Sequence, residues 1–162
     1  TGEIRSRGIE LEAKAAVNAN VNVTASYTYT DAQYQHDTTF NGKRPAEVPR
    51  NMASLWADYT FHETALSGLT VGAGARYVGS TVSYYKNDTS TGKKDDAFNV
   101  AGYALMDATV KYDLARFGLP GSSIGVNVNN LFDREYVSSC YSEYACYWGA
   151  ERQVVATATF RF

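Results

Sequence analysis

The two cysteines of the chain, Cys140 and Cys146, are the residues with the clearest capacity for chemistry. They are too few for a zinc site and lack the CxxC spacing of a redox motif. A local disulfide and a pair of free thiols are the remaining alternatives, and we expect the disulfide, which would place this segment in an oxidising compartment such as the periplasm or the cell surface. Four aromatic residues follow the first cysteine closely: Tyr141, Tyr144, Tyr147 and Trp148.

The other reactive side chains do not form a catalytic or metal-binding pattern. His36 and His62 have no Ser or Cys neighbour at a catalytic spacing. The run Gly72-Ala73-Gly74 lacks the third glycine and the strand-to-helix setting of a dinucleotide fingerprint, so we interpret it as strand glycines that ease curvature or allow close approach. Residues 93–96, with sequence KKDD, suit a hydrated loop tip better than a cation site. We therefore expect no enzyme, no catalytic residues and no metal ligands.

The composition restricts the class of protein. The chain has 162 residues, about one domain's length, and 15 Lys and Arg against 17 Asp and Glu give a net charge of −2. This balance offers no basic face for nucleic acid. No apolar run approaches the roughly 18 residues that a membrane-spanning helix needs. The segment 1–7 has no charged start followed by an apolar core, so we expect no secretory signal there and take the chain as cytosolic, mature or partial.

Apolar and polar residues alternate with a period of two along most of the chain, which predicts β-strands. No sustained helical periodicity is present, so the sequence predicts an all-β protein. Seven segments carry one apolar and one polar face each: 9–15, 21–30, 52–61, 69–77, 106–113, 124–129 and 153–162.

The connections between these segments alternate in length. Short ones cover 17–20, 62–68 and 115–122, and long polar ones cover 31–50, 80–99 and 137–150. An antiparallel up-and-down meander with short turns at one end and long loops at the other is typical of an outer-membrane β-barrel. We therefore predict about seven transmembrane strands of a larger barrel.

Aromatic residues gather near the ends of the outward faces. Those expected at the short-turn end are Tyr59, Phe61, Tyr112, Phe160 and Phe162, and those expected at the long-loop end are Tyr27, Tyr29 and Tyr77. Tyr is also simply a good strand former. Placement at both ends rather than in the middle favours the aromatic girdles that flank a lipid-facing band.

The strand count and the polar faces predict a piece of a large barrel. Bacterial single-chain barrels have an even number of strands, and an open edge in lipid leaves backbone groups unsatisfied. We therefore expect a C-terminal portion whose first strand pairs with sequence outside this chain. The charges on the polar faces suit a wide lumen that holds water or a plug: Glu10, Glu12, Lys14, Asp58, Arg76, Lys111 and Arg161.

Two motifs point to a family. The end of the chain, with Phe160 and Phe162, resembles the signal read by the outer-membrane barrel assembly machinery. Another segment resembles the NLFD(K/R)xY motif near the C-terminus of TonB-dependent outer-membrane receptors, and it comprises Asn130, Leu131, Phe132, Asp133, Arg134 and Tyr136. With Gly68-Leu69-Thr70, Arg76-Tyr77 and Tyr112-Asp113-Leu114, the resemblance to enterobacterial ferric hydroxamate (ferrichrome) receptors extends along essentially the whole chain.

This resemblance implies a barrel of about 22 strands that is closed by an N-terminal plug. Such a receptor imports a ferric siderophore with energy transmitted by TonB through the plug. Iron would travel inside the siderophore complex, and the protein would carry no covalently bound cofactor. The implied partners are the siderophore, TonB, outer-membrane lipid and lipopolysaccharide, with phages or bacteriocins as further candidates and no nucleic acid.

The resemblance also assigns candidate ligand contacts. An aromatic residue directly after the first cysteine of the last long loop, more often Phe in the family, contributes to the siderophore pocket, and Tyr141 occupies that place. Tyr144, Tyr147 and Trp148 would line the vestibule or pack the loop. Two other classes stay open at this point: a passive porin-like channel, and a secreted soluble β-domain that packs its apolar faces as a sandwich.

Overall fold

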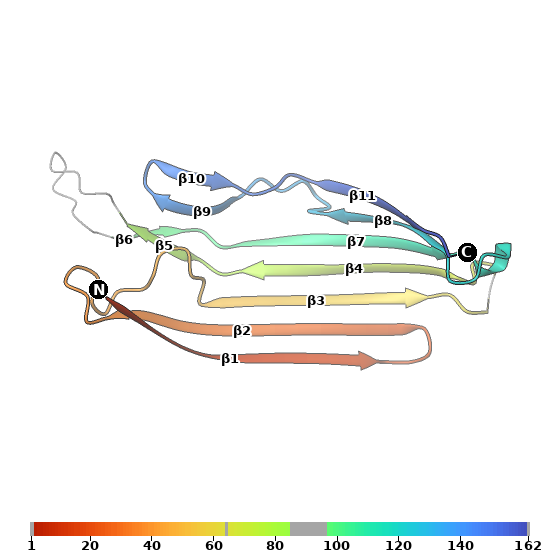
Figure 1. Cartoon of the computed structure of the whole chain (residues 1–162), viewed down its shortest axis with the longest axis horizontal. Helices are drawn as coiled ribbons and strands as arrows, with labels where there is room; N and C mark the ends of the chain where they lie inside the picture. Colours follow the sequence, from red (N-terminus) through yellow and green to blue (C-terminus); the bar gives the residue numbers. More distant parts are fainter. Residues whose placement is uncertain (1, 64, 85–96, 162) are drawn as a thin grey trace.

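The computed structural model describes residues 2–63, 65–84 and 97–161. Its main element is one antiparallel sheet with the strand order β1-β2-β3-β4-β7-β8-β11 (Figure 1). The sheet strands are β1 (Glu3–Ala16), β2 (Val21–Gln35), β3 (Asn51–Thr60), β4 (Leu69–Val78), β7 (Tyr103–Asp113), β8 (Ser123–Asn129) and β11 (Gln153–Thr159). Two further hairpins pair β5 (Thr81–Tyr84) with β6 (Ala97–Val100) and β9 (Val137–Ser142) with β10 (Ala145–Trp148).

The seven sheet strands follow one another as a meander, which confirms the all-β prediction. Figure 1 shows the connection after β2 and both extra hairpins at one end of the sheet and the short turns at the other. The last short turn contains the 3-10 helix η1 (Ala115–Phe117). Within the described ranges, no helix has the length and apolar character to cross a membrane.

The strand register builds two chemically different faces. One row across the first face consists of Ala13, Ala25, Leu55, Ala75 and Met106. A second row, nearer the short turns, consists of Val21, Tyr59, Val71, Val110, Val126 and Ala156. This apolar face is open: Leu11 is 61% exposed and Val154 is 64% exposed. A continuous exposed apolar surface of this kind requires an apolar partner, and lipid provides one along its whole extent.

The opposite face is polar, and its side chains bond across neighbouring strands. Asn22 Nδ2 donates to Asp58 Oδ2 at 3.0 Å, and the hydroxyl oxygens of Ser26 and Ser54 lie 2.7 Å apart. Alternation along each strand places these residues behind the apolar rows. We call this side the polar face below.

The glycines of Gly72-Ala73-Gly74 make room for a tryptophan on the polar face. A Cβ at Gly72 would lie 2.8 Å from Cζ2 of Trp56, and one at Gly74 would lie 2.5 Å from Cε3 of the same ring. The indole therefore lies directly against the backbone of β4, which confirms the predicted close approach.

The strand ends differ from the sequence prediction in two places. β1 and β2 continue past the predicted segments, with Arg5 opposite Gln33 and Arg7 opposite Asp31, because backbone pairing extends beyond the apolar band to positions where polar residues replace the apolar ones on that face. At the other end, β11 stops at Thr159, so Phe160 follows the strand and is 54% exposed. Phe162 and residues 93–96 lie outside the described residues.

Candidate functional site

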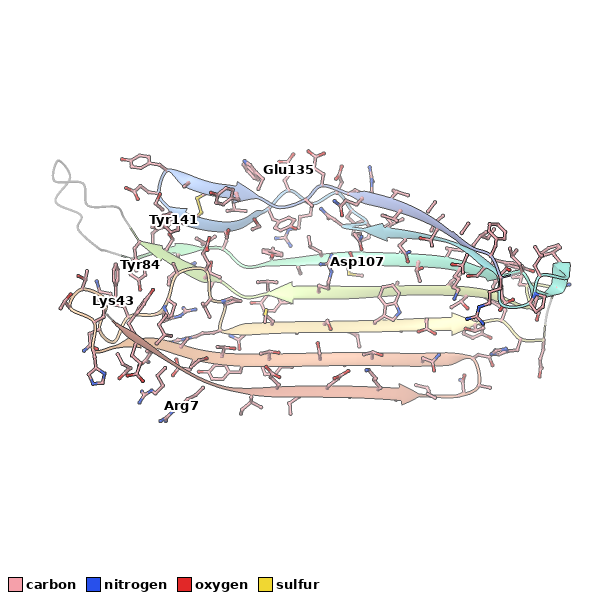
Figure 2. The ribbon with its side chains drawn as sticks, in the orientation of Figure 1. Arg7, Lys43, Tyr84, Asp107, Glu135 and Tyr141 are labelled. Atoms are coloured by element: carbon pink, nitrogen blue, oxygen red, sulfur yellow. A yellow bond between two sulfur atoms is a disulfide. The ribbon has the colours of Figure 1, made fainter. Side chains whose placement is uncertain are left out.

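The long-loop end of the sheet carries the candidate ligand contacts. Figure 2 labels Lys43, Tyr84 and Tyr141 at this end, while Asp107 lies further along the sheet. Three segments meet here: the connection after β2, the β5–β6 hairpin and the β9–β10 hairpin. Their packing decides which aromatic side chains are held in place and which are presented to the exterior.

The connection after β2 folds back onto β2 and β5. The rings of Phe40 and Tyr84 lie 5.0 Å apart, and Lys43 Nζ lies 5.3 Å from the Phe40 ring centre and 5.7 Å from that of Tyr84. The Tyr84 hydroxyl donates to the Arg44 carbonyl at 2.6 Å, and the Glu47 N–H donates to the Val82 carbonyl at 3.1 Å. Cation–π contact and backbone bonds together fix this loop against β5.

Burial and local bonding shift three pKa values in this loop region. Burial raises the pKa of the Tyr84 phenol, and neighbouring Tyr34 acts in the same direction. Burial also lowers the pKa of the Arg44 guanidinium. The backbone N–H groups of Phe40 and Thr39 donate to the Asp37 carboxylate and hold its pKa below the usual range. The raised pKa favours the neutral form of the Tyr84 phenol, which is the form that donates to the Arg44 carbonyl.

The β9 strand packs on β5 through small side chains. Thr81 and Ser83 of β5 are 6% and 0% exposed, and Cys140 and Ser142 of β9 are 3% and 6% exposed. Because side chains alternate along a strand, Tyr141 must point away from this packed face, and it is 69% exposed. The close packing of β9 thus determines the direction of the Tyr141 side chain.

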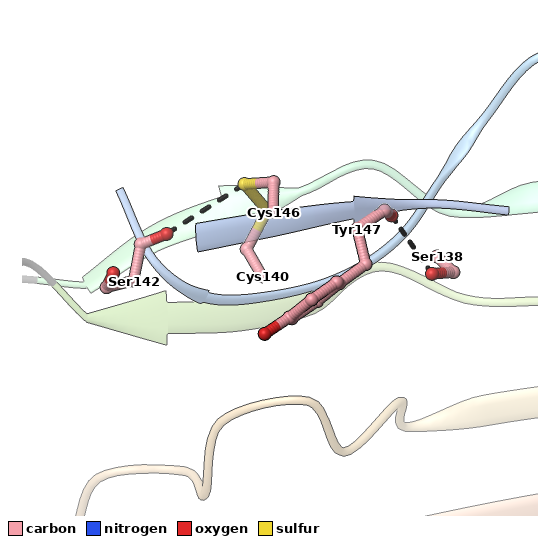
Figure 3. Close-up of a disulfide and its surroundings, with 5 residues drawn as sticks. All are labelled: Ser138, Cys140, Ser142, Cys146 and Tyr147. Carbon is pink, nitrogen blue, oxygen red and sulfur yellow. Dashed lines mark hydrogen bonds between the residues drawn. A yellow bond between two sulfur atoms is a disulfide. The ribbon is translucent and has the colours of Figure 1, made fainter. Parts of the chain in front are cut away.

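A disulfide joins Cys140 of β9 to Cys146 of β10, with 4.0 Å between their Cα atoms (Figure 3). Ser138 Oγ donates to the Tyr147 carbonyl at 3.0 Å. Cys146 Sγ, which has no proton in the disulfide, contacts the Ser142 carbonyl oxygen at 3.9 Å. The hairpin is therefore closed along its length by one covalent link and by backbone and side-chain hydrogen bonds.

The four predicted ligand contacts all lie on this hairpin and are open to solvent. Tyr141, Tyr144, Tyr147 and Trp148 are 69%, 80%, 60% and 73% exposed. Trp148 borders a hollow of about 270 Å³ together with Tyr136. A second hollow of about 330 Å³ lies between the start of β7 and the start of β9. Its aromatic lining consists of Phe98, Tyr103 and Tyr136, and none of the four predicted ligand contacts borders it.

The base of the hairpin is held by the side chain of Asn130, a residue of the NLFD segment that is 3% exposed. Its Nδ2 donates to the carbonyls of Arg134 at 2.9 Å and Ala150 at 3.1 Å, and its Oδ1 accepts the Arg134 N–H at 2.9 Å. Arg134 precedes β9 and Ala150 follows β10. One amide therefore joins the two ends of the hairpin, with both of its N–H donors and its carbonyl oxygen engaged.

The same segment covers the part of the β7 edge that β8 does not reach. The Leu131 N–H donates to the Met106 carbonyl at 2.7 Å, and Arg134 Nη1 donates to the Ala104 carbonyl at 3.1 Å. Asn130 and Asp133 adopt left-handed φ angles of 52° and 53°, which sharpen the turn. The segment thus replaces a strand at a sheet edge that would otherwise leave carbonyls unpaired.

Tyr136 closes the base of the hairpin from the other side. Its ring stacks at an angle on Tyr103 with centroids 4.2 Å apart, and its carbonyl accepts the Gly149 N–H at 2.8 Å. A Cβ at Gly149 would fall 1.9 Å from Cζ of the Tyr136 ring, so only glycine fits there. Asp133 adds a further link, because its Oδ1 accepts the Arg152 N–H at 2.7 Å.

Sequence reasoning missed several residues of this arrangement. Asp107, Tyr103 and Gly149 were not singled out, although Asp107 lies on the polar side of a clearly alternating strand. His36 and His62 are at opposite ends of the sheet: His36 Nδ1 is 3.5 Å from Glu3 Oε2, and His62 Nε2 is 3.0 Å from the Ala19 carbonyl. The structure brings neither histidine into the hairpin region.

Ser83→Ala should stabilise the packing of β9 on β5. The Ser83 hydroxyl is fully buried and has no hydrogen-bond partner within the described part of the chain. Since a buried unsatisfied hydroxyl costs about 1 to 3 kcal/mol, its removal should raise the free energy of unfolding of this region by about 1 kcal/mol. The measurement is calorimetric unfolding of the full-length protein in detergent. Ser54→Ala is the matched control, because it removes a hydroxyl that is paired with Ser26 and should lower the free energy of unfolding. A decrease in the free energy of unfolding with Ser83→Ala as large as that with Ser54→Ala would contradict the prediction.

The meander, its apolar face and its sorted loops define a segment of a transmembrane β-barrel of the bacterial outer membrane. The family described as "TonB dependent receptor-like, beta-barrel" matches residues 1–131, and the chain belongs to this family.

Named relatives agree with this assignment. The chain is 61% identical over 161 residues to the ferrichrome outer membrane transporter/phage receptor of Escherichia coli K12. This alignment covers 99% of this chain and 20% of that protein. It is 41% identical to the ferrioxamine B receptor of Salmonella typhimurium SL1344, covering 99% of this chain and 22% of that protein. The solved FpvAI–pyocin S2 complex matches with a TM-score of 0.74 and 27% identity over 94% of this chain and 18% of that one. The chain thus spans about a fifth of the length of these relatives, which are named as transporters or receptors.

Proposed function

We propose that this chain is the C-terminal part of the barrel of an outer-membrane receptor that binds and imports ferric hydroxamate siderophores of the ferrichrome type. The observation that carries the proposal is the 61% identity with the E. coli ferrichrome transporter along 99% of the chain. Iron would be cargo inside the siderophore, so the protein needs no ligand to the metal itself.

The geometry of the long-loop end supports this proposal. A ferric hydroxamate is a compact neutral chelate, which is recognised by aromatic surfaces and hydrogen-bond donors rather than by charge. The β9–β10 hairpin presents Tyr141, Tyr144, Tyr147 and Trp148 on a disulfide-closed support. A rigid support reduces the entropy lost when a ligand orders these side chains.

The remaining partners follow from the same proposal. The polar face would line a lumen filled by the plug, through which TonB supplies energy, and the apolar face would contact lipid and lipopolysaccharide. Phages or bacteriocins are further candidate partners, because the E. coli relative is named as a phage receptor and a structural neighbour was solved with pyocin S2. Family membership favours an energised receptor over a passive porin and over a soluble β-sandwich.

The test is iron uptake by cells that express the full-length receptor and lack other siderophore receptors. We expect radiolabelled ferrichrome iron to accumulate in cells with TonB and not in cells without it. Ferrioxamine B is the second ligand to test, because of the 41% identity with a ferrioxamine B receptor. Uptake that is independent of TonB would instead support a passive channel, and uptake of ferrioxamine B alone would overturn the ferrichrome assignment.

A further inference from the structure

An ion pair on the polar face connects the barrel wall with the hairpin. Arg76 of β4 and Asp107 of β7 form a bidentate pair: Nε donates to Oδ2, and Nη2 donates to Oδ1 at 3.0 Å. The side chain of Asp107 is 12% exposed and that of Arg76 is 51% exposed. Arg76 is therefore reachable from the lumen side, whereas the carboxylate is enclosed.

The Asp107 carboxylate also holds the residue that joins the two ends of the hairpin. Its Oδ1 accepts the backbone N–H of Asn130 at 3.0 Å, in a bond between buried groups. Asn130 in turn bonds Arg134 and Ala150, on either side of the β9–β10 hairpin. A continuous set of hydrogen bonds thus runs from Arg76 on the lumen wall to the base of the hairpin that carries Tyr141.

We infer that Asp107 is a positioning residue for this hairpin: it fixes Asn130, and thereby the placement of the aromatic side chains above the mouth of the barrel. Its interaction with Arg76 makes that placement sensitive to whatever contacts Arg76 in the lumen. An acidic group in the lumen that drew Arg76 away would leave the enclosed Asp107 carboxylate without its cationic partner. An unpaired charge in this position is destabilising, so the base of the hairpin that it holds would loosen. The siderophore part of this inference rests on the proposed function, whereas the hairpin part does not.

The experiment compares Asp107→Ala with Asp58→Ala in the full-length receptor. Asp58 is a suitable control because it is a carboxylate on the same face, but its bond is to Asn22, far from the hairpin. A second pair compares Arg76→Met with Lys111→Met, a cation on the same face near the short turns. This second pair keeps the test decisive if Asp107→Ala fails to fold.

The first readout is the rate at which dithiothreitol reduces the Cys140–Cys146 disulfide, followed by thiol labelling. We expect Asp107→Ala to accelerate reduction about tenfold, which corresponds to the loss of one charge-assisted hydrogen bond, and Arg76→Met to accelerate it by a smaller factor. Asp58→Ala and Lys111→Met should reduce at the wild-type rate. Unchanged heat-modifiable migration on gels would show that the barrel itself is intact.

The second readout is transport of ferrichrome. Loosened placement of the hairpin should raise the KM about tenfold while the maximal rate changes less than twofold, a split that a general loss of barrel stability would not produce. Equal reduction rates and equal KM values for Asp107→Ala and Asp58→Ala would overturn the inference while the proposed function stands. Absence of ferrichrome uptake by the wild type would refute the proposed function, and the reduction rates would still decide the role of Asp107.

Discussion

Asn130→Ala is expected to open the base of the β9–β10 hairpin while the barrel remains folded. The substitution removes the amide that bonds the Arg134 N–H and the carbonyls of Arg134 and Ala150, and it leaves these backbone groups without a partner. At about 1 kcal/mol for each lost bond, the local cost is about 3 kcal/mol. The left-handed backbone at Asn130, with φ of 52°, adds about 1 kcal/mol because Ala tolerates this region poorly.

Limited proteolysis of the full-length receptor in detergent measures this effect. A cost of about 4 kcal/mol corresponds to roughly a thousandfold rise in the open population, so cleavage within residues 137–150 should become much faster. Asn130→Gly separates the two causes, because Gly keeps the left-handed backbone and loses only the amide. Asn130→Asp keeps the acceptor for the Arg134 N–H but places a buried carboxylate oxygen against the Arg134 and Ala150 carbonyls, so it should open the hairpin at least as much as Gly. If Gly matched the wild type, backbone strain rather than the amide would be the cause.

The barrel strands could be predicted from the sequence because each has a lipid-facing side and a polar side. This two-sided environment forces the period-two pattern, as in Val71, Ala73 and Ala75 against Thr70, Gly72 and Gly74. The pattern also predicted which side of each strand is apolar, and the observed register confirms this prediction. The placement of short turns at one end and long loops at the other followed directly, because successive connections of a meander lie at alternate ends of the sheet.

The two extra hairpins could not be predicted in the same way. Residues of β9, with sequence VSSCYS, pack against β5 through small polar side chains rather than through an apolar face. Ser83 and Ser142 are buried although their types are usually exposed. Local periodicity contains no information about such packing, because it arises from a second loop far along the chain.

The role of the NLFD segment was equally invisible in the sequence. Its resemblance to a family motif was clear, but the reason for its residues lies in distant partners: Asp107, Ala150 and Gly149. Asn130 is required as an amide with three bonds and as a residue that tolerates a left-handed turn. Sequence spacing cannot reveal a bond that joins the segments before and after a hairpin.

Tyr141→Ala should weaken the binding of ferrichrome by about thirtyfold, given the proposed function. Tyr141 lies between Cys140 and Ser142, whose burial on β5 directs its ring away from the packed face. Truncation of a central aromatic contact typically costs about 2 kcal/mol, which gives this factor. The measurement is ferrichrome binding to the full-length receptor at low temperature, where transport does not contribute.

Tyr141→Phe is the decisive companion to this variant. Phe keeps the aromatic surface and the strand propensity and removes only a hydroxyl, so binding close to wild type would assign the contact to the ring face. A loss with Phe as large as that with Ala would assign it to the hydroxyl as a hydrogen-bond donor. Tyr144→Ala, at an 80% exposed position of the same hairpin, tests whether the effect is specific to the position fixed by β9. Equal losses at both tyrosines would mean that the whole tip binds the ligand, and no loss at Tyr141 would remove it from the site.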